Sequence, residues 1–259
     1  MRLSPVSLIV SLLSTLVLIY LVAIATLYLK QREILFHPSG KTATTQGEFI
    51  DGDIWVEIRN RGREKAVVYL GGNDENYWIP PDSLADALPE YTIYLLHYPG
   101  YGKSGGTPSQ KSIFRAVTKL YEHIESRHTS ISAIGRSLGS GPAIYLASRK
   151  RIDRLILVTP YHSILSLAKE RYPIFPIEAI CKDPFPSHNY AKSVDSDTLV
   201  ILASEDSVVP HDSSIALIKS FERDDIEMVT IPDTNHGDIT SNPAFYSIVS
   251  KFLSENSGF

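Results

Sequence analysis

Gly135-Arg136-Ser137-Leu138-Gly139 lies between a short apolar run and a segment with the composition of a helix. We predict that residues 131–134 form a buried strand and that residues 138–149 form a helix. At such a junction the chain turns too sharply for side chains at the flanking positions, so glycine is favoured there. The pattern predicts that the two glycines leave the Ser137 hydroxyl raised above the sheet edge as a nucleophile. The alternative is a serine in a tight structural turn.

A serine becomes a good nucleophile when an imidazole accepts its proton and a carboxylate orients that imidazole. Candidates for both roles lie in loops that follow later apolar runs. Asp206 follows residues 198–203, and His236 follows residues 226–231. The carboxyl ends of parallel strands share one edge of a sheet, so we predict that Ser137, Asp206 and His236 meet there.

Each partner of the serine also has an alternative interpretation. Asp206 could cap a helix or close a turn, and Glu205 and Asp233 are its rivals for the acid role. A loop histidine is commonly only solvated, and Asp238 could orient His236 instead. The order serine, acid, histidine along the chain favours the three-residue site.

The charge that develops on a substrate carbonyl oxygen requires backbone N–H donors. One would come from Leu138, the residue after the serine. The other would come from the loop after the strand predicted at residues 65–70, where Gly71-Gly72 precedes Asn73. We therefore predict that the backbone N–H groups of Asn73 and Leu138 form an oxyanion hole. A phosphate-binding loop is disfavoured, because no Lys-Ser/Thr follows at the required spacing.

Five stretches, in order, carry a resemblance to a known family. They cover most of the chain after residue 30 and read QREILFHP (31–38), GGNDEN (71–76), YPGYGKS (98–104), GRSLGSG (135–141) and ASEDSVVP (203–210). The chain resembles the α/β-hydrolase superfamily and, within it, the Bem46-like group, whose members have an N-terminal membrane segment. The resemblance implies an α/β-hydrolase fold and a serine hydrolase with Ser137, Asp206 and His236 at the matching positions.

Two stretches depart from the pattern of this group. Gly71-Gly72-Asn73 stands where many relatives have His-Gly-Asn, so an imidazole that orders this loop is absent. The histidine motif is Asn-His-Gly-Asp at residues 235–238, whereas His-Asn-Asp is commoner. Both departures leave the predicted catalytic groups in place.

Length and composition fit one enzyme domain behind a short N-terminal segment. Of 259 residues, 43% are hydrophobic, which suffices for a sizeable core. The formal net charge of −4 gives no basic surface for nucleic acid, so we expect no nucleic-acid partner. The single cysteine, Cys181, forms no internal disulfide, and no Cys/His spacing indicates a metal site. We expect neither a metal nor another cofactor.

The N-terminus is the second strong signal in the sequence. Residues 3–29 contain no charged side chain, and Lys30 ends this run. The run is longer than the core of a signal peptide and meets the roughly 20 residues that a bilayer requires. We predict a single-pass membrane anchor at residues 1–30 and a catalytic domain at residues 31–259. The alternative is a signal peptide cleaved after Ala23-Ile24-Ala25, and basic residues on both sides of the run leave its orientation open.

Strand and helix patterns alternate along the rest of the chain. We predict a mostly parallel sheet covered by helices on both faces. Residues 53–59 alternate apolar and charged side chains, so we expect a half-exposed strand, paired antiparallel with residues 65–70 at one edge. The other predicted elements are strands at residues 91–98 and 155–158 and helices at residues 110–126, 212–222 and 243–254.

Residues 160–192 are interrupted by prolines, with aromatic side chains between them. They form either a small cap over an acyl pocket or an irregular connection packed on the core. Trp78, Tyr98 and Tyr101 either border the pocket or pack in the core, and Arg136 either faces the substrate or lies on the surface.

These observations predict a membrane-anchored serine hydrolase that cleaves an acyl ester or thioester of a small molecule or lipid. Its alternatives are a non-enzymatic scaffold with the same fold and a serine peptidase or amidase. Fluorophosphonate labelling separates an enzyme from a scaffold, and a comparison of esters with aminoacyl amides separates the two enzyme classes.

Overall fold

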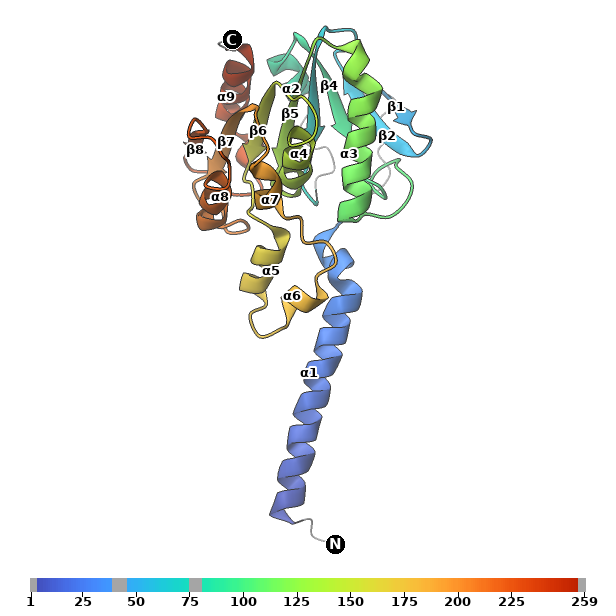
Figure 1. Ribbon diagram of the computed structural model, residues 1–259, viewed down its shortest axis with the longest axis vertical. Coiled ribbons are helices and arrows are strands. Elements are labelled where there is room, and N and C mark those ends of the chain that lie inside the picture. The colour runs from blue at the N-terminus through green and yellow to red at the C-terminus, as the bar shows by residue number, and fades with distance from the viewer. Residues whose placement is uncertain (1–3, 39–45, 75–80, 256–259) are drawn as a thin grey trace.

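The computed structural model describes residues 4–38, 46–74 and 81–255. A long N-terminal helix leads away from a layered domain in which helices cover a central sheet (Figure 1). The described residues form one 8-stranded sheet in the order β1-β2-β4-β3-β5-β6-β7-β8. Its strands are β1 (Gly47–Ile50), β2 (Ile54–Arg59), β3 (Lys65–Leu70), β4 (Tyr91–Leu96), β5 (Ser130–Arg136), β6 (Arg154–Val158), β7 (Asp197–Ala203) and β8 (Glu227–Ile231).

Strands β3 to β8 run parallel, whereas β1 and β2 form an antiparallel edge. The helices are α1 (Pro5–Leu35), α2 (Pro81–Ala87), α3 (Gln110–Ile124), α4 (Ser140–Ala147), α5 (Ile164–Arg171), α6 (Ile177–Ile180), α7 (Ser187–Ala191), α8 (His211–Ile218) and α9 (Pro243–Ser254). Helices α3, α4, α7 and α8 pack on one face of the sheet, and α2 and α9 pack on the other. The predicted α/β fold class is thus confirmed.

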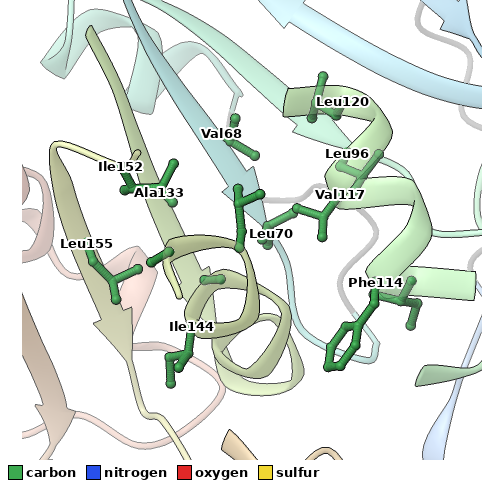
Figure 2. Close-up of a cluster of buried hydrophobic side chains, with 14 of the residues drawn as sticks. Val68, Leu70, Leu96, Phe114, Val117, Leu120, Ala133, Ile144, Ile152 and Leu155 are labelled. Atoms are coloured by element: carbon green, nitrogen blue, oxygen red, sulfur yellow. The ribbon is translucent and has the colours of Figure 1, made fainter. Parts of the chain in front are cut away.

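The core forms because strands and helices each present apolar side chains to the sheet faces. Along α3, Ile113, Val117, Leu120 and Ile124 recur every three or four residues and are all fully buried. Figure 2 shows how α3 and α4 direct such side chains onto neighbouring strands of the sheet. The carboxyl ends of the strands are therefore held in fixed relative positions.

The predicted pairing of residues 53–59 with residues 65–70 is wrong. Strand β2 pairs antiparallel with β1 on one side and with β4 on the other, so β4 lies between β2 and β3. The four-residue strand β1 was not predicted, because so short a segment has no clear periodicity. The prediction of a half-exposed β2 is also wrong. Glu57 is only 2% exposed and forms an ion pair with Arg59 beside the buried His97.

Two predicted helices are shorter than their sequence patterns indicated. The segment expected at residues 138–149 begins with a 3₁₀ turn, Ser137–Gly139, and is α-helical only in α4. The segment expected at residues 212–222 is α-helical in α8 and then turns so that Phe221 returns to the core. The helix expected at residues 110–126 is α-helical as far as Ile124, and that expected at residues 243–254 is present as α9.

Helix α1 is the one described helix long and apolar enough to cross a bilayer. It begins at a cap in which the Ser4 hydroxyl accepts a hydrogen bond from the Ser7 N–H. None of its residues is buried, but Phe36, directly after its last turn, is 1% exposed and belongs to the domain core. Its C-terminal end is thus joined directly to the domain.

Candidate active site

The turn after β5 holds Ser137 in a conformation that few residues adopt. The φ angle of Ser137 is +49°, in the left-handed region. A Cβ atom at Gly139 would lie 2.0 Å from the Leu70 carbonyl oxygen, and one at Gly135 would lie 2.5 Å from the Gly139 carbonyl oxygen. Only glycine fits these two positions, so the turn can pack closely against the end of β3.

A chain of hydrogen bonds links the three residues that the sequence predicts for catalysis. His236 Nε2 lies 2.8 Å from Ser137 Oγ, and His236 Nδ1 lies 2.7 Å from Asp206 Oδ2. Each residue follows a different strand, β5, β7 or β8, at the same edge of the sheet. The side chains of His236 and Asp206 are 14% and 2% exposed. An imidazole in this arrangement can accept the serine proton while the carboxylate fixes its tautomer.

Asp206 is held as a carboxylate by several donors. Its Oδ1 accepts hydrogen bonds from the backbone N–H groups of Val208 and Val209 at 2.9 and 2.8 Å. Burial alone would raise the pKa of Asp206, but the hydrogen bonds from His236 and from these two N–H groups outweigh it, so the pKa lies below its usual value. The carboxylate is therefore charged at neutral pH and can stabilise an imidazolium.

The rival acids occupy other positions. Glu205 and Asp233 are exposed. Asp238 accepts hydrogen bonds from the backbone N–H and the side-chain amide of Asn235. It therefore shapes the loop that carries His236, whereas the described contact of the imidazole Nδ1 is with Asp206.

The loop after β3 lies beside the serine. Asn73 and Leu138, the predicted oxyanion donors, line the same cavity as Ser137. The hydroxyl of Tyr98 donates to the Gly71 carbonyl at 2.8 Å, and that of Tyr101 donates to the Asn73 carbonyl at 2.9 Å. Two buried tyrosines thus hold the backbone of Gly71 and Asn73 in place beside the serine. Burial raises the pKa of Tyr101, so its hydroxyl stays protonated and able to donate. Trp78 and residues 75–76 lie outside the described residues.

A cavity of about 460 Å³ opens over Ser137. Most of its lining is apolar, as in sites that take a hydrocarbon group. The lining comes from α1, from the region of α5 and α6, and from the loop after Asp206; apolar members include Leu27, Ile34, Leu35, Ile164, Leu167, Ile177, Ile180, Val208 and Val209. Cys181 also lines it, and burial raises the pKa of this thiol, which disfavours a thiolate. Among the described residues no group of His, Cys, Asp or Glu side chains is arranged to hold a metal ion.

Sequence reasoning missed the contribution of α1 to this cavity. When an apolar stretch is long enough to span a membrane, its sequence does not indicate which of its residues also face a pocket. The sequence also left open whether Arg136 faces the substrate or lies on the surface, and the structure shows a different role, a contact with the loop that carries His236. Arg136 is 9% exposed, and its Nη2 donates to the His236 carbonyl at 2.7 Å.

We expect Arg136→Met to lower kcat by roughly 10- to 100-fold with little change in KM, because a small displacement of a catalytic group is costly. The substitution removes the donor that holds the carbonyl of the His236 loop, so Nε2 would no longer be aligned with Ser137 Oγ. Steady-state kinetics on a soluble acyl ester measure the effect. Arg136→Lys should restore part of kcat.

The matched control is Arg115→Met, since Arg115 forms an exposed ion pair with Asp51 away from the cavity. It should leave both kinetic constants unchanged. A loss of thermal stability in Arg136→Met with no fall in kcat would show that Arg136 supports the fold and does not position His236.

The comparisons with known proteins agree with this architecture. Residues 65–176 match the family model described as "alpha/beta hydrolase fold". The chain is 29% identical over 168 residues to the human alpha/beta hydrolase domain-containing protein 17C. This alignment covers 62% of this chain and 49% of the relative. The chain is 28% identical over 169 residues to the Caenorhabditis elegans alpha/beta hydrolase domain-containing protein aho-3, covering 62% of this chain and 48% of the relative. The chain thus spans about half the length of these relatives.

An uncharacterised Mycobacterium tuberculosis protein matches over a longer stretch, with 24% identity over 277 residues that cover 98% of this chain and 96% of the relative. Among solved structures, an esterase from Pyrococcus furiosus superposes with a TM-score of 0.65 at 17% identity, covering 85% of this chain and 96% of the esterase. A monoacylglycerol lipase from Paleococcus ferrophilus superposes with a TM-score of 0.58 at 17% identity, covering 78% of this chain and 98% of the lipase. These structures share the fold. The family model over residues 65–176, the relatives and the shared fold together support the α/β-hydrolase superfamily for this chain.

Proposed function

We propose that this protein is a membrane-anchored serine hydrolase that cleaves an acyl ester or thioester through an acyl-enzyme. The observation that carries the proposal is the unbroken hydrogen-bond chain from Ser137 Oγ through His236 to Asp206, at 2.8 and 2.7 Å. The apolar cavity over Ser137 supports an acyl substrate. Helix α1 supports attachment to a bilayer by its length and composition.

In the first half of the reaction, Ser137 Oγ attacks the carbonyl carbon and its proton passes to His236 Nε2. The backbone N–H groups of Asn73 and Leu138 stabilise the negative charge on the carbonyl oxygen. The tetrahedral intermediate then collapses, the bond to the alcohol or thiol breaks, and the leaving group takes the proton from His236. The acyl group stays on Ser137.

In the second half, a water molecule gives its proton to His236 Nε2 and attacks the acyl-enzyme. Collapse of this second intermediate releases the carboxylic acid and returns the proton to Ser137. Asp206 stabilises the imidazolium in both halves without taking the proton itself. These steps balance with water as the only co-reactant.

The test is fluorophosphonate labelling of the full chain in detergent, with the labelled residue located by mass spectrometry. We expect rapid labelling of Ser137 that is lost in Ser137→Ala and kept in Ser148→Ala, a serine at the far end of α4. A series of nitrophenyl esters and aminoacyl amides then defines the reaction. Labelled protein that cleaves only the amides would identify a peptidase, and folded but unlabelled protein would favour the scaffold.

A further inference from the structure

Helix α1 is both a candidate membrane span and a wall of the cavity over Ser137. Leu27, Gln31, Ile34 and Leu35 of α1 line this cavity. The opposite wall belongs to residues 163–183, which we call the α5–α6 segment. The cavity therefore lies between a helix long enough to cross a bilayer and a segment far from it in sequence.

Specific contacts fix the α5–α6 segment against α1. The Gln31 side chain donates to the Ile180 carbonyl at 2.9 Å and accepts from the Lys182 N–H at 2.6 Å. Arg32 Nε lies 2.7 Å from Asp183 Oδ2, and this carboxylate is only 5% exposed. A buried carboxylate paired with arginine holds the two elements in one geometry. The two walls thus form one unit.

A further contact between α1 and the α5–α6 segment lies nearer the N-terminus of α1. The Tyr20 ring stacks on Phe175 with 5.6 Å between centroids, and the Tyr20 hydroxyl donates to the Ile174 carbonyl at 2.7 Å. Ile174 is 71% exposed. In Figure 1 the α5–α6 segment extends from the domain alongside α1, with the turn between the two short helices at its far end. An exposed apolar tip beside an apolar helix is a feature of membrane-contacting surfaces.

The position of Tyr20 sets the depth of this tip. A helix that crosses the hydrocarbon core uses about 20 residues. Any such window between Pro5 and Leu29 includes Tyr20, so a bilayer crossed by α1 would place residues 174 and 175 at the level of its hydrocarbon. With about 1.5 Å per residue, the tip reaches roughly 6 to 14 Å below the boundary.

One pair of side chains between the tip and the domain agrees with this depth. The Lys182 ammonium lies 3.8 Å from the centroid of the Tyr28 ring. Tyrosine and lysine are enriched at the headgroup level, where an amphipathic side chain keeps its polar end in water. In the sequence, Lys182 comes after the tip, where the chain returns to the domain. The boundary of the bilayer would thus cross α1 between the tip and the domain.

The cavity lining extends from Ser137 toward this tip. Leu27 and Ile177 line the cavity, and they are the lining residues nearest along the chain to Tyr20 and to Phe175. The lining thus includes Ser137, where the ester would be cleaved, and apolar side chains toward the tip, such as Leu27 and Ile177. This is the orientation of an acyl chain in a membrane, with its ester at the surface and its methyl end in the hydrocarbon.

We propose that the substrate is an acyl lipid resident in the bilayer, whose chain enters sideways between α1 and the α5–α6 segment. Helix α1 is then a substrate-binding element as well as an anchor. The proposal rests on the serine hydrolase activity proposed above and names its substrate class. The chain moves from hydrocarbon to an apolar cavity without crossing water, so long-chain substrates avoid the cost of exposing each methylene group.

The test compares two esters with the same leaving group on the full chain reconstituted in phosphatidylcholine vesicles. One is methylumbelliferyl palmitate incorporated in the vesicles, and the other is methylumbelliferyl butyrate in solution. Leu27→Trp adds bulk at the membrane end of the cavity. Leu29→Trp is the matched control, because Leu29 is 70% exposed and does not line the cavity.

We expect Leu27→Trp to lower the ratio of kcat/KM for palmitate to that for butyrate by roughly 10-fold or more, since several buried methylene groups lose their site. Leu29→Trp should leave the ratio at the wild-type value. An equal ratio in Leu27→Trp, Leu29→Trp and wild type would overturn lateral entry. Hydrolysis of neither ester by wild type would instead contradict the proposed activity itself.

The depth of the tip has an independent test that does not use activity. We expect tryptophan fluorescence of the Ile174→Trp variant to be quenched by lipids brominated on the acyl chain more strongly than that of the wild type. Absence of additional quenching would place the tip in water and overturn the proposed route.

Discussion

Asp206→Asn is expected to lower kcat for a soluble acyl ester by about 10⁴-fold while the protein stays folded. The asparagine oxygen can still accept the hydrogen bonds from the N–H groups of Val208 and Val209 that Asp206 Oδ1 now receives. Its amide nitrogen would then face His236 Nδ1 and donate to it. The imidazole would carry its proton on Nε2, where it could no longer accept the proton of Ser137. Steady-state kinetics and thermal unfolding measure the two parts of this expectation.

Asp238→Asn is the matched control, because Asp238 lies in the His236 loop but binds Asn235. We expect its effect on kcat to be within about 10-fold, as for a group that only shapes the loop. If Asp238→Asn loses activity to the larger extent and Asp206→Asn does not, then Asp238 is the acid that orients the histidine.

Gly139→Ala is expected to lower the free energy of unfolding by more than about 3 kcal/mol, at the upper end of the usual cost of overpacking. The added methyl carbon would lie 2.0 Å from the Leu70 carbonyl oxygen and 2.7 Å from that of Gly71. Both are backbone atoms, so no rotamer change can relieve the collision. For a chain of this size the loss corresponds to a fall in Tm of roughly 6–12 °C.

Gly62→Ala separates this collision from an ordinary backbone effect. Gly62 has a φ of +88°, but a Cβ atom there meets nothing within 4 Å. We expect a loss of about 1–2 kcal/mol, due only to the left-handed backbone conformation. Equal losses in the two variants would show that the turn can move away from β3.

The site could be predicted from the sequence to the extent that it depends on the order of strands. Ser137, Asp206 and His236 each follow an apolar run, and the ends of parallel strands share one edge. The roles of these residues stay predictions until the variants are measured. Local pattern was sufficient for these placements because each residue lies within a few positions of its strand.

Features that depend on distant contacts could not be predicted in this way. The pairing of β2 with β4 in place of β3 is decided by packing across the sheet, because either strand could supply backbone hydrogen bonds to β2. The burial of Glu57 depends on Arg59 and on proximity to His97, which a pattern of alternating residues does not reveal. The contact of Gln31 with Ile180 joins residues 149 positions apart.

The separation of the α5–α6 segment from the sheet has a consequence for engineering and for evolutionary change. The groups proposed to break the bond follow strands β5, β7 and β8, whereas most of the cavity lining comes from α1 and from a short insertion between β6 and β7. Such an insertion can be exchanged between chains without rebuilding the turn at Ser137. Each graft must, however, supply its own partners for Gln31 and Arg32, so the N-terminal helix and the insertion are expected to be inherited as a pair.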